Sequence, residues 1–249
     1  MILQKGGNRT LRLGCLTDVG KVRDINQDCF ATSLEHGLLM VADGMGGHLA
    51  GEKAAQSAVD IITAMLTAEI SHNGDMRQLI RQAIQEANRQ IVQASLQDSS
   101  MRGMGTTATV AMTIDDMVHI GHVGDSRAYL LREGTIEQIT EDHSVVAQLL
   151  KAGAITSQEA ANHPYRNVIT RCLGMQTDVE ADTISLPFRP GESLLLCTDG
   201  LSGLVSDDEL LKLASEARDP QDACQKMLEL AIARGGYDNV TVVLLHYQT

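Results

Sequence analysis

The feature that most constrains the fold is a change of hydrophobic periodicity near Thr106. Residues 50–69 and 76–96 repeat apolar side chains at helical spacing, which predicts two amphipathic helices. Short segments with the spacing of β-strands then follow at residues 106–114, 117–123, 126–132 and 135–139. Asp115-Asp116 and Glu133-Gly134 have the composition of hairpin turns. Consecutive short strands on tight turns predict antiparallel sheet, because parallel strands need long crossover connections.

The rest of the chain continues with strands and helices of ordinary length. Further strands are predicted at residues 11–17, 29–34, 38–42, 179–186, 193–197 and 240–246. Further helices are predicted at residues 144–152, 207–217 and 219–233. No internal repeat, low-complexity tract or linker divides the sequence, so we expect one domain over residues 1–249. Within it, we expect residues 1–10 to form a loose lead-in.

Charge and composition disfavour several classes of function. The net charge is −12, from 20 Lys and Arg against 32 Asp and Glu, which disfavours nonspecific binding to nucleic acid or anionic membranes. Two bound divalent cations would invert the local field, so phosphate substrates are not excluded. The five cysteines are widely spaced without a Cys-x-x-Cys motif, so we expect buried thiols. No signal peptide or apolar run of about 20 residues is present, so we expect a cytoplasmic protein.

Five aspartates stand at the edges of predicted strands, namely Asp28, Asp43, Asp125, Asp199 and Asp238. Aspartate is common in ordinary turns, so each one alone carries little information. If the strands form two packed sheets, however, their ends can converge into one acidic cleft, whose carboxylates would repel one another without metal ions between them. An all-oxygen ligand set fits Mg²⁺ or Mn²⁺ better than zinc or copper. His119 and His122 are three residues apart on one predicted strand, so we expect structural roles for them.

The loop after Asp43 is rich in glycine, with four glycines in eight residues. Glycine lets the backbone approach a ligand closely, and Gly44 directly follows the carboxylate. An ordinary Gly-rich turn explains this loop equally well when it is considered alone. The metal hypothesis therefore depends on the other carboxylates.

Eight short motifs occur along the chain in this order: TDVGKVRDINQD (17–28), VADGMGGH (41–48), MGTTAT (104–109), VGDSRAY (123–129), EDHSVV (141–146), HPYRNVITRCLG (163–174), CTDGL (197–201) and YDNVT (237–241). Their order closely resembles the metal-dependent protein phosphatases of the PPM, or type 2C, family in its bacterial form. Any one motif is weak, but eight in the right order are highly specific. The resemblance runs from about Leu11 to the C-terminus.

The resemblance implies an α+β fold of four layers, α-β-β-α, in which a central antiparallel β-sandwich lies between helix pairs. It also implies a centre of two Mn²⁺ or Mg²⁺ ions at one end of the sandwich. In that mapping Asp43 bridges both ions and the Gly44 carbonyl ligates one of them. Asp199 and Asp238 complete the shell of the other ion.

Four further positions have roles that the resemblance implies. Asp28 supports the metal pair through bound water, and Asp125 matches a third, weaker metal site of bacterial members. Arg23 matches the arginine that grips the substrate phosphate, a task suited to its bidentate guanidinium. Asn239 resembles a neighbour that steadies Asp238 or binds the phosphate through its water network.

The implied function is a metal-dependent phosphatase of phosphoserine and phosphothreonine in proteins. A water activated by the two metal ions would attack phosphorus in line, without a phosphoenzyme. Two alternatives are a catalytically weak regulatory or phosphopeptide-binding module and a hydrolase of small phosphate esters. We expect a monomer that acts on phosphorylated proteins, the targets of a bacterial Ser/Thr kinase, with no nucleic-acid or membrane partner.

Two positions differ from animal members of the family, and one segment matches a part of the family that varies. Animal members carry a histidine, a proposed general acid, where this chain has Met45, and His48 is not an obvious substitute, so the leaving-group acid is unassigned. Gln27 stands where animal members have glutamate. Residues 144–177 match the variable flap beside the cleft, where His163 and Arg166 are candidates for flap contacts or for structural roles.

Overall fold

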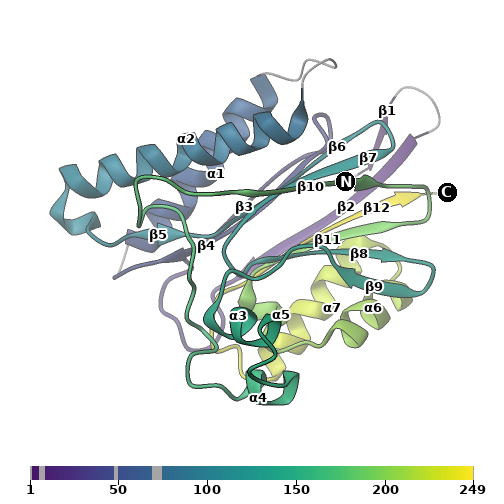
Figure 1. Ribbon diagram of the computed structural model, residues 1–249. Helices are drawn as coiled ribbons and strands as arrows, with labels where there is room; N and C mark the ends of the chain where they lie inside the picture. The colour runs from purple at the N-terminus through teal and green to yellow at the C-terminus, as the bar shows by residue number, and fades with distance from the viewer. Residues whose placement is uncertain (1, 6–8, 48–49, 69–74, 249) are drawn as a thin grey trace.

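The computed structural model describes residues 2–5, 9–47, 50–68 and 75–248. Two antiparallel sheets stack face to face between two helical layers (Figure 1). In order across the first sheet lie β1 (Ile2–Lys5), β2 (Arg9–Asp18), β12 (Val240–Gln248), β11 (Ser193–Cys197), β8 (Arg127–Arg132) and β9 (Thr135–Gln138). Across the second lie β10 (Asp182–Pro187), β7 (Met117–Val123), β6 (Ala108–Ile114), β4 (Leu38–Met45) and β3 (Asp28–Ser33), and β5 (Gly105–Thr106) pairs with β4.

Helix pairs cover the outer faces of both sheets. Two long helices, α1 (Ala50–Ala68) and α2 (Met76–Gln97), pack on the second sheet, and a 3₁₀ turn, η1 (Ser99–Met101), follows them. The first sheet is covered by α6 (Asp207–Glu216) and α7 (Pro220–Ala233). Two short helices, α3 (Val145–Lys151) and α4 (Ser157–Ala161), project from one end of the sandwich, near the short α5 (Asp199–Ser202) (Figure 1). The predicted four-layer α-β-β-α fold is confirmed.

Strand β4 shows how the sequence builds two cores at once. Its side chains alternate, so Leu38, Met40 and Ala42 pack beneath α1 and α2. Leu39 and Val41 point the other way, into the space between the two sheets. All five are at most 1% exposed, which explains why the strand reads as a continuous apolar run rather than as an alternating one.

The predicted hairpins are confirmed by their backbone geometry. Asp115 (φ 50°) joins β6 to β7, and Glu133 (φ 52°) with Gly134 (φ 74°) joins β8 to β9. Such left-handed residues match the twist of the flanking strands in two-residue turns. No helix in the described ranges is long and apolar enough to cross a membrane.

The expectation of a loose lead-in over residues 1–10 is wrong for the residues that the structure describes there. Residues 2–5 form β1, which pairs with β2 in the register Ile2 opposite Arg12. The pairing uses backbone N–H and C=O groups, so a polar sequence does not prevent it. As the edge strand of its sheet, β1 needs no continuous apolar pattern.

Candidate metal centre

Aspartates from both sheets meet at one end of the sandwich. Asp28 and Asp43 lie directly opposite each other on β3 and β4 of the second sheet. Asp199, the first residue of α5, follows β11, and Asp238 precedes β12, so both belong to the first sheet. Asp43 and Asp199 line one cavity and are close enough for each to shift the pKa of the other. The structure therefore brings together four of the predicted metal ligands across the gap between the sheets.

The electrostatics of these groups reflect burial and mutual repulsion. Burial is the main cause that raises the pKa of Asp28 to about 7, and nearby Asp199 and Asp238 raise it further. Burial raises the pKa of Asp125 to about 7 as well, with Asp199 adding to the shift. The same causes raise the pKa of Asp43 well above its ordinary value and raise that of Asp199. Ionised together, these carboxylates need a compensating positive charge.

Three buried carboxylate oxygens accept no hydrogen bond from any described residue, namely Oδ1 of Asp28, Asp125 and Asp199. Buried polar atoms are normally paired, so such orphans point to a missing partner. A hard cation is the natural partner, because each orphan is a carboxylate oxygen. Yet, among the residues that the structure describes, no group of three acidic, His or Cys side chains already surrounds a single ion position.

Asp238 forms an ion pair with Arg23 at the carboxylate cluster. Its Oδ2 accepts a hydrogen bond from Arg23 Nη2 at 2.8 Å, and its Oδ1 accepts one from the Asn239 N–H at 2.9 Å. This ion pair is the main cause that raises the pKa of Arg23. Because the pair is about half exposed, it contributes little to stability and can be exchanged for another partner.

Asn239 fixes the loop that carries Arg23. Its Oδ1 accepts from the Gln27 N–H at 2.8 Å, and its Nδ2 donates to the carbonyls of Val19 and Ile25 at 2.9 and 3.0 Å. The residue is only 5% exposed. These contacts give Asn239 a positioning role, and its predicted contact with phosphate stays a prediction.

Threonines that the sequence interpretation missed support the carboxylates. The hydroxyls of Thr198 and Thr241 both donate to Asp28 Oδ2 at 2.8 Å. The Asp43 N–H donates to Thr107 Oγ1 at 2.8 Å. Each threonine belongs to one of the motifs CTDGL, YDNVT or MGTTAT. The only feature of the sequence that pointed to these threonines was their position near an aspartate or a glycine in a motif.

The glycine loop packs closely on the start of α1. A Cβ atom on Gly44 would collide with the carbonyl of Gly51, which explains why only glycine fits there. Met45 ends β4 opposite Gly105, and Gln27 Nε2 donates to the Gly46 carbonyl at 3.4 Å. His48 lies outside the described residues, so nothing follows for the leaving-group acid.

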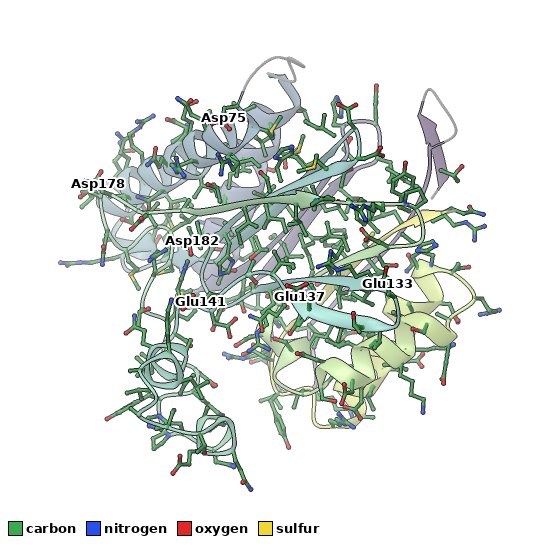
Figure 2. The ribbon with its side chains drawn as sticks, turned by 45° about the vertical axis from the view of Figure 1, so that its right-hand side comes forward. Asp75, Glu133, Glu137, Glu141, Asp178 and Asp182 are labelled. Atoms are coloured by element: carbon green, nitrogen blue, oxygen red, sulfur yellow. The ribbon has the colours of Figure 1, made fainter. Side chains whose placement is uncertain are left out.

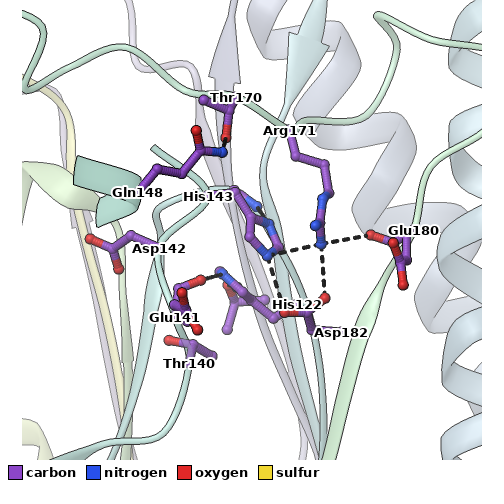
Figure 3. Close-up of polar contacts among 12 residues, drawn as sticks. His122, Thr140, Glu141, Asp142, His143, Gln148, Thr170, Arg171, Glu180 and Asp182 are labelled. Carbon is purple, nitrogen blue, oxygen red and sulfur yellow. Dashed lines mark hydrogen bonds and ion pairs between the residues drawn. The ribbon is translucent and has the colours of Figure 1, made fainter. Parts of the chain in front are cut away.

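A polar network holds the base of the predicted flap (Figure 3). The Gly124 N–H donates to His143 Nδ1 at 3.0 Å, so in the neutral ring Nε2 carries the proton that faces Asp182 at 3.2 Å. Arg171 Nη1 donates to Asp182 Oδ1 at 2.8 Å. Burial alone would raise the pKa of Asp182, but hydrogen bonds from His143 and Arg171 lower it. In Figure 2, Glu141 lies where the chain leaves the first sheet toward α3, and Asp182 lies at the start of β10, where the chain returns to the second sheet.

Sequence and structure comparisons agree with this geometry. A profile of the protein phosphatase 2C family matches residues 21–232. The serine/threonine phosphatase stp of Listeria welshimeri is 39% identical over 239 residues, which cover 92% of this chain and 93% of that protein. The crystal structure of the Mycobacterium tuberculosis serine/threonine phosphatase PstP/Ppp superposes with a TM-score of 0.90 at 36% identity, covering 96% of this chain and 99% of that one. The PstP catalytic domain in complex with two manganese ions gives a TM-score of 0.88 at 35% identity, with the same coverage.

Proposed function

This chain belongs to the protein phosphatase 2C family and is a metal-dependent serine/threonine protein phosphatase, and from that premise we propose that its carboxylate cluster holds two divalent cations, Mn²⁺ or Mg²⁺. The observation that carries the proposal is the set of buried, unpartnered carboxylate oxygens contributed by both sheets. The two manganese ions of the PstP catalytic domain support it by similarity.

The proposed ligands keep the roles that the resemblance implies. Asp43 would bridge the two ions, and the Gly44 carbonyl would bind one of them. Asp199 and Asp238 would bind the other. Asp28, fixed by two threonine hydroxyls, would hold water in the outer shell.

The bound ions would lower the pKa of water and neutralise charge on the phosphoryl oxygens. The chain's own contribution is to orient the substrate and exclude competing groups. Arg23 stands at the rim of the cluster, with 53% of its side chain exposed, and its guanidinium suits bidentate contact with phosphate. Release of Asp238 toward a metal ion would free that guanidinium for the substrate.

A nucleophile on the protein is not needed. Cys172 lines the cleft. The pKa of its thiol is raised to about 11, mainly by burial. The thiol is therefore protonated at neutral pH and a poor nucleophile. Direct attack by water, without a phosphoenzyme, remains the favoured route.

Asp125 is proposed to hold a third, more weakly bound ion at the edge of the cluster. It is 7% exposed, and its Oδ1 is one of the unpartnered oxygens.

We further propose that residues 1–249 act as one catalytic domain and as a monomer, since one chain supplies every proposed ligand. Phosphoproteins made by a bacterial Ser/Thr kinase are the proposed substrates.

A phosphothreonine peptide assay tests the function directly. Purified protein should release phosphate with Mn²⁺ and stop when EDTA is added. Asp43→Asn and Asp199→Asn should each lower kcat/KM by more than about 100-fold, because each removes a proposed direct ligand of the metal ions. Substitution of an outer-shell partner of a ligand already lowers affinity or activity by about 10–100-fold. Asp60→Asn, on the exposed face of α1, is the matched control and should keep full activity.

Three outcomes would contradict the proposal. Full activity in both aspartate variants would place the centre elsewhere. Mn²⁺ binding by calorimetry without phosphate release from any peptide would indicate a binding module, and hydrolysis confined to nucleotides or sugar phosphates would indicate a small-ester hydrolase.

A further inference from the structure

Two cavities meet at the carboxylate cluster. One, of about 560 Å³, extends between α3 and α5 and is called the α3 arm. The other, of about 640 Å³, extends between the glycine loop and residues 168–179 and is called the Met45 arm. Asp125, Asn167, Asp199 and Asp238 line both, so the arms open from one centre. Each has the size of an ordinary ligand pocket, about 300–1,000 Å³.

Exposed apolar side chains line each arm. Leu150 and Tyr237, 36% and 63% exposed, line the α3 arm. Val168 and Met175, 42% and 55% exposed, line the Met45 arm. Exposed apolar surface gathered around a polar site is typical of a binding surface. Leu96, 81% exposed on α2, lines neither arm and serves as a control position.

The positive charges in the arms are largely engaged within the protein. Arg127 in the α3 arm donates from Nε and Nη2 to the carboxylate of Asp142, with contacts of 2.7–3.1 Å. Arg171 in the Met45 arm is ion-paired with Asp182 at 2.8 Å. Acidic side chains of a substrate would gain little from cations that are already paired. The arms therefore favour apolar side chains.

We propose that the enzyme prefers phosphoserine or phosphothreonine sites with apolar side chains two residues before and two residues after the phosphorylated residue. The proposal rests on the phosphatase function above. In an extended segment, side chains at positions −2 and +2 point to the same side as the phosphorylated one, about 7 Å away on either side. The phosphoryl group would lie at the carboxylate cluster, with one apolar side chain in each arm.

Synthetic phosphothreonine peptides test the preference. Three peptides of one flexible sequence would carry Leu, Gln or Glu at both −2 and +2, with kcat/KM measured under saturating Mn²⁺. Leu at both positions should exceed Gln by about 10-fold or more, because burying part of a leucine side chain gives a gain of this size. Equal rates for Leu and Gln, or a preference for Glu, would overturn the proposal. A preference for Glu would assign the α3 arm, which Arg166 also lines, to the recognition of acidic side chains.

Variants then assign each arm. Leu150→Ser and Met175→Ser should each reduce the Leu-to-Gln ratio of kcat/KM severalfold, whereas Leu96→Ser should leave the ratio unchanged. The ratio is internal to each protein, so partial unfolding of a variant does not affect it. Hydrolysis of all three peptides at one rate would refute only this preference, whereas hydrolysis of none with Mn²⁺ would refute the phosphatase function.

Discussion

Asp28 shows how neighbours orient a buried carboxylate. Its Oδ2 accepts two threonine hydroxyl hydrogens, and its Oδ1 accepts none from the described residues. The two bonds fix the side-chain rotamer and leave Oδ1 available to a bound ion or water. Outer-shell hydrogen bonds of this kind orient metal ligands and tune their affinity.

At this scale we predict that Thr241→Val weakens Mn²⁺ binding. The substitution keeps the volume and removes one of the two bonds that orient Asp28, so the dissociation constant measured by calorimetry should rise about 10–100-fold. Thr113→Val is the matched control, since Thr113 is also buried but bonds the Gly37 carbonyl at the hairpin before β4. An unchanged affinity in Thr241→Val would mean that Asp28 does not take part in metal binding.

The residue scale also shows the limit of prediction from sequence. Each aspartate could be found because it follows or precedes an apolar run, and four of the five stand beside Gly or Asn. The bond between Asp28 and Thr241 joins residues 213 positions apart, and no local pattern encodes such a pair. The ion pair between Arg23 and Asp238 was unpredictable for the same reason.

At the scale of elements, the flap is attached to the core through a small number of directional bonds. The His143 N–H donates to the Gly124 carbonyl at 2.7 Å, and the Thr170 N–H donates to the His143 carbonyl at 2.7 Å. His143 therefore bonds both the loop that carries Asp125 and the strand-like segment that returns from the flap. Asp182 joins His143 and Arg171 from β10.

We predict that Asp182→Asn loosens the flap more than the domain. The amide loses its charge toward Arg171, so amide hydrogen exchange in residues 144–169 should accelerate severalfold. The pair is partly exposed, so global stability should fall by only about 1 kcal/mol. Glu137→Gln, which breaks an exposed pair with Arg132 on the β8–β9 hairpin, should leave flap exchange unchanged. Uniformly faster exchange across the domain would contradict this prediction.

Element prediction succeeded where a segment was long and periodic. The helices predicted at 50–69 and 76–96 are observed as α1 and α2. The predicted end at residue 69 lies outside the described residues, and the other ends agree within one residue. Four short elements were missed, namely β1, η1, α4 and α5. Segments of three to five residues complete too little of a period to show a pattern, and tertiary contacts decide their conformation.

At the scale of the whole molecule, the carboxylate cluster lies between two sheets that are otherwise joined by apolar packing. Without cations, repulsion among buried carboxylates opposes the stacking of the sheets at this end. With cations, ligands from both sheets share the same ions, and binding to the folded state alone adds stability.

We therefore predict opposite effects of Asp43→Asn with and without metal. In EDTA the variant should melt several degrees above the unsubstituted protein, because one buried negative charge is removed. On addition of Mn²⁺ the unsubstituted protein should gain thermal stability, and the variant should gain much less. Calorimetric melting curves of both proteins would show the crossing. A variant that is less stable in both conditions would indicate a purely structural role for Asp43.

The position of β12 has a consequence for how the protein is made. This strand fills the middle of the first sheet, between β2 and β11, although it is the last described strand in the chain. Chains emerge from the ribosome with their N-terminal residues first. Strands β2 and β11 therefore have no strand between them until residues 240–248 have been synthesised. Asp238, two residues before the start of β12, is synthesised at almost the same time. A partly synthesised chain therefore has no complete centre and cannot remove phosphate from cellular proteins before its own sheet is closed.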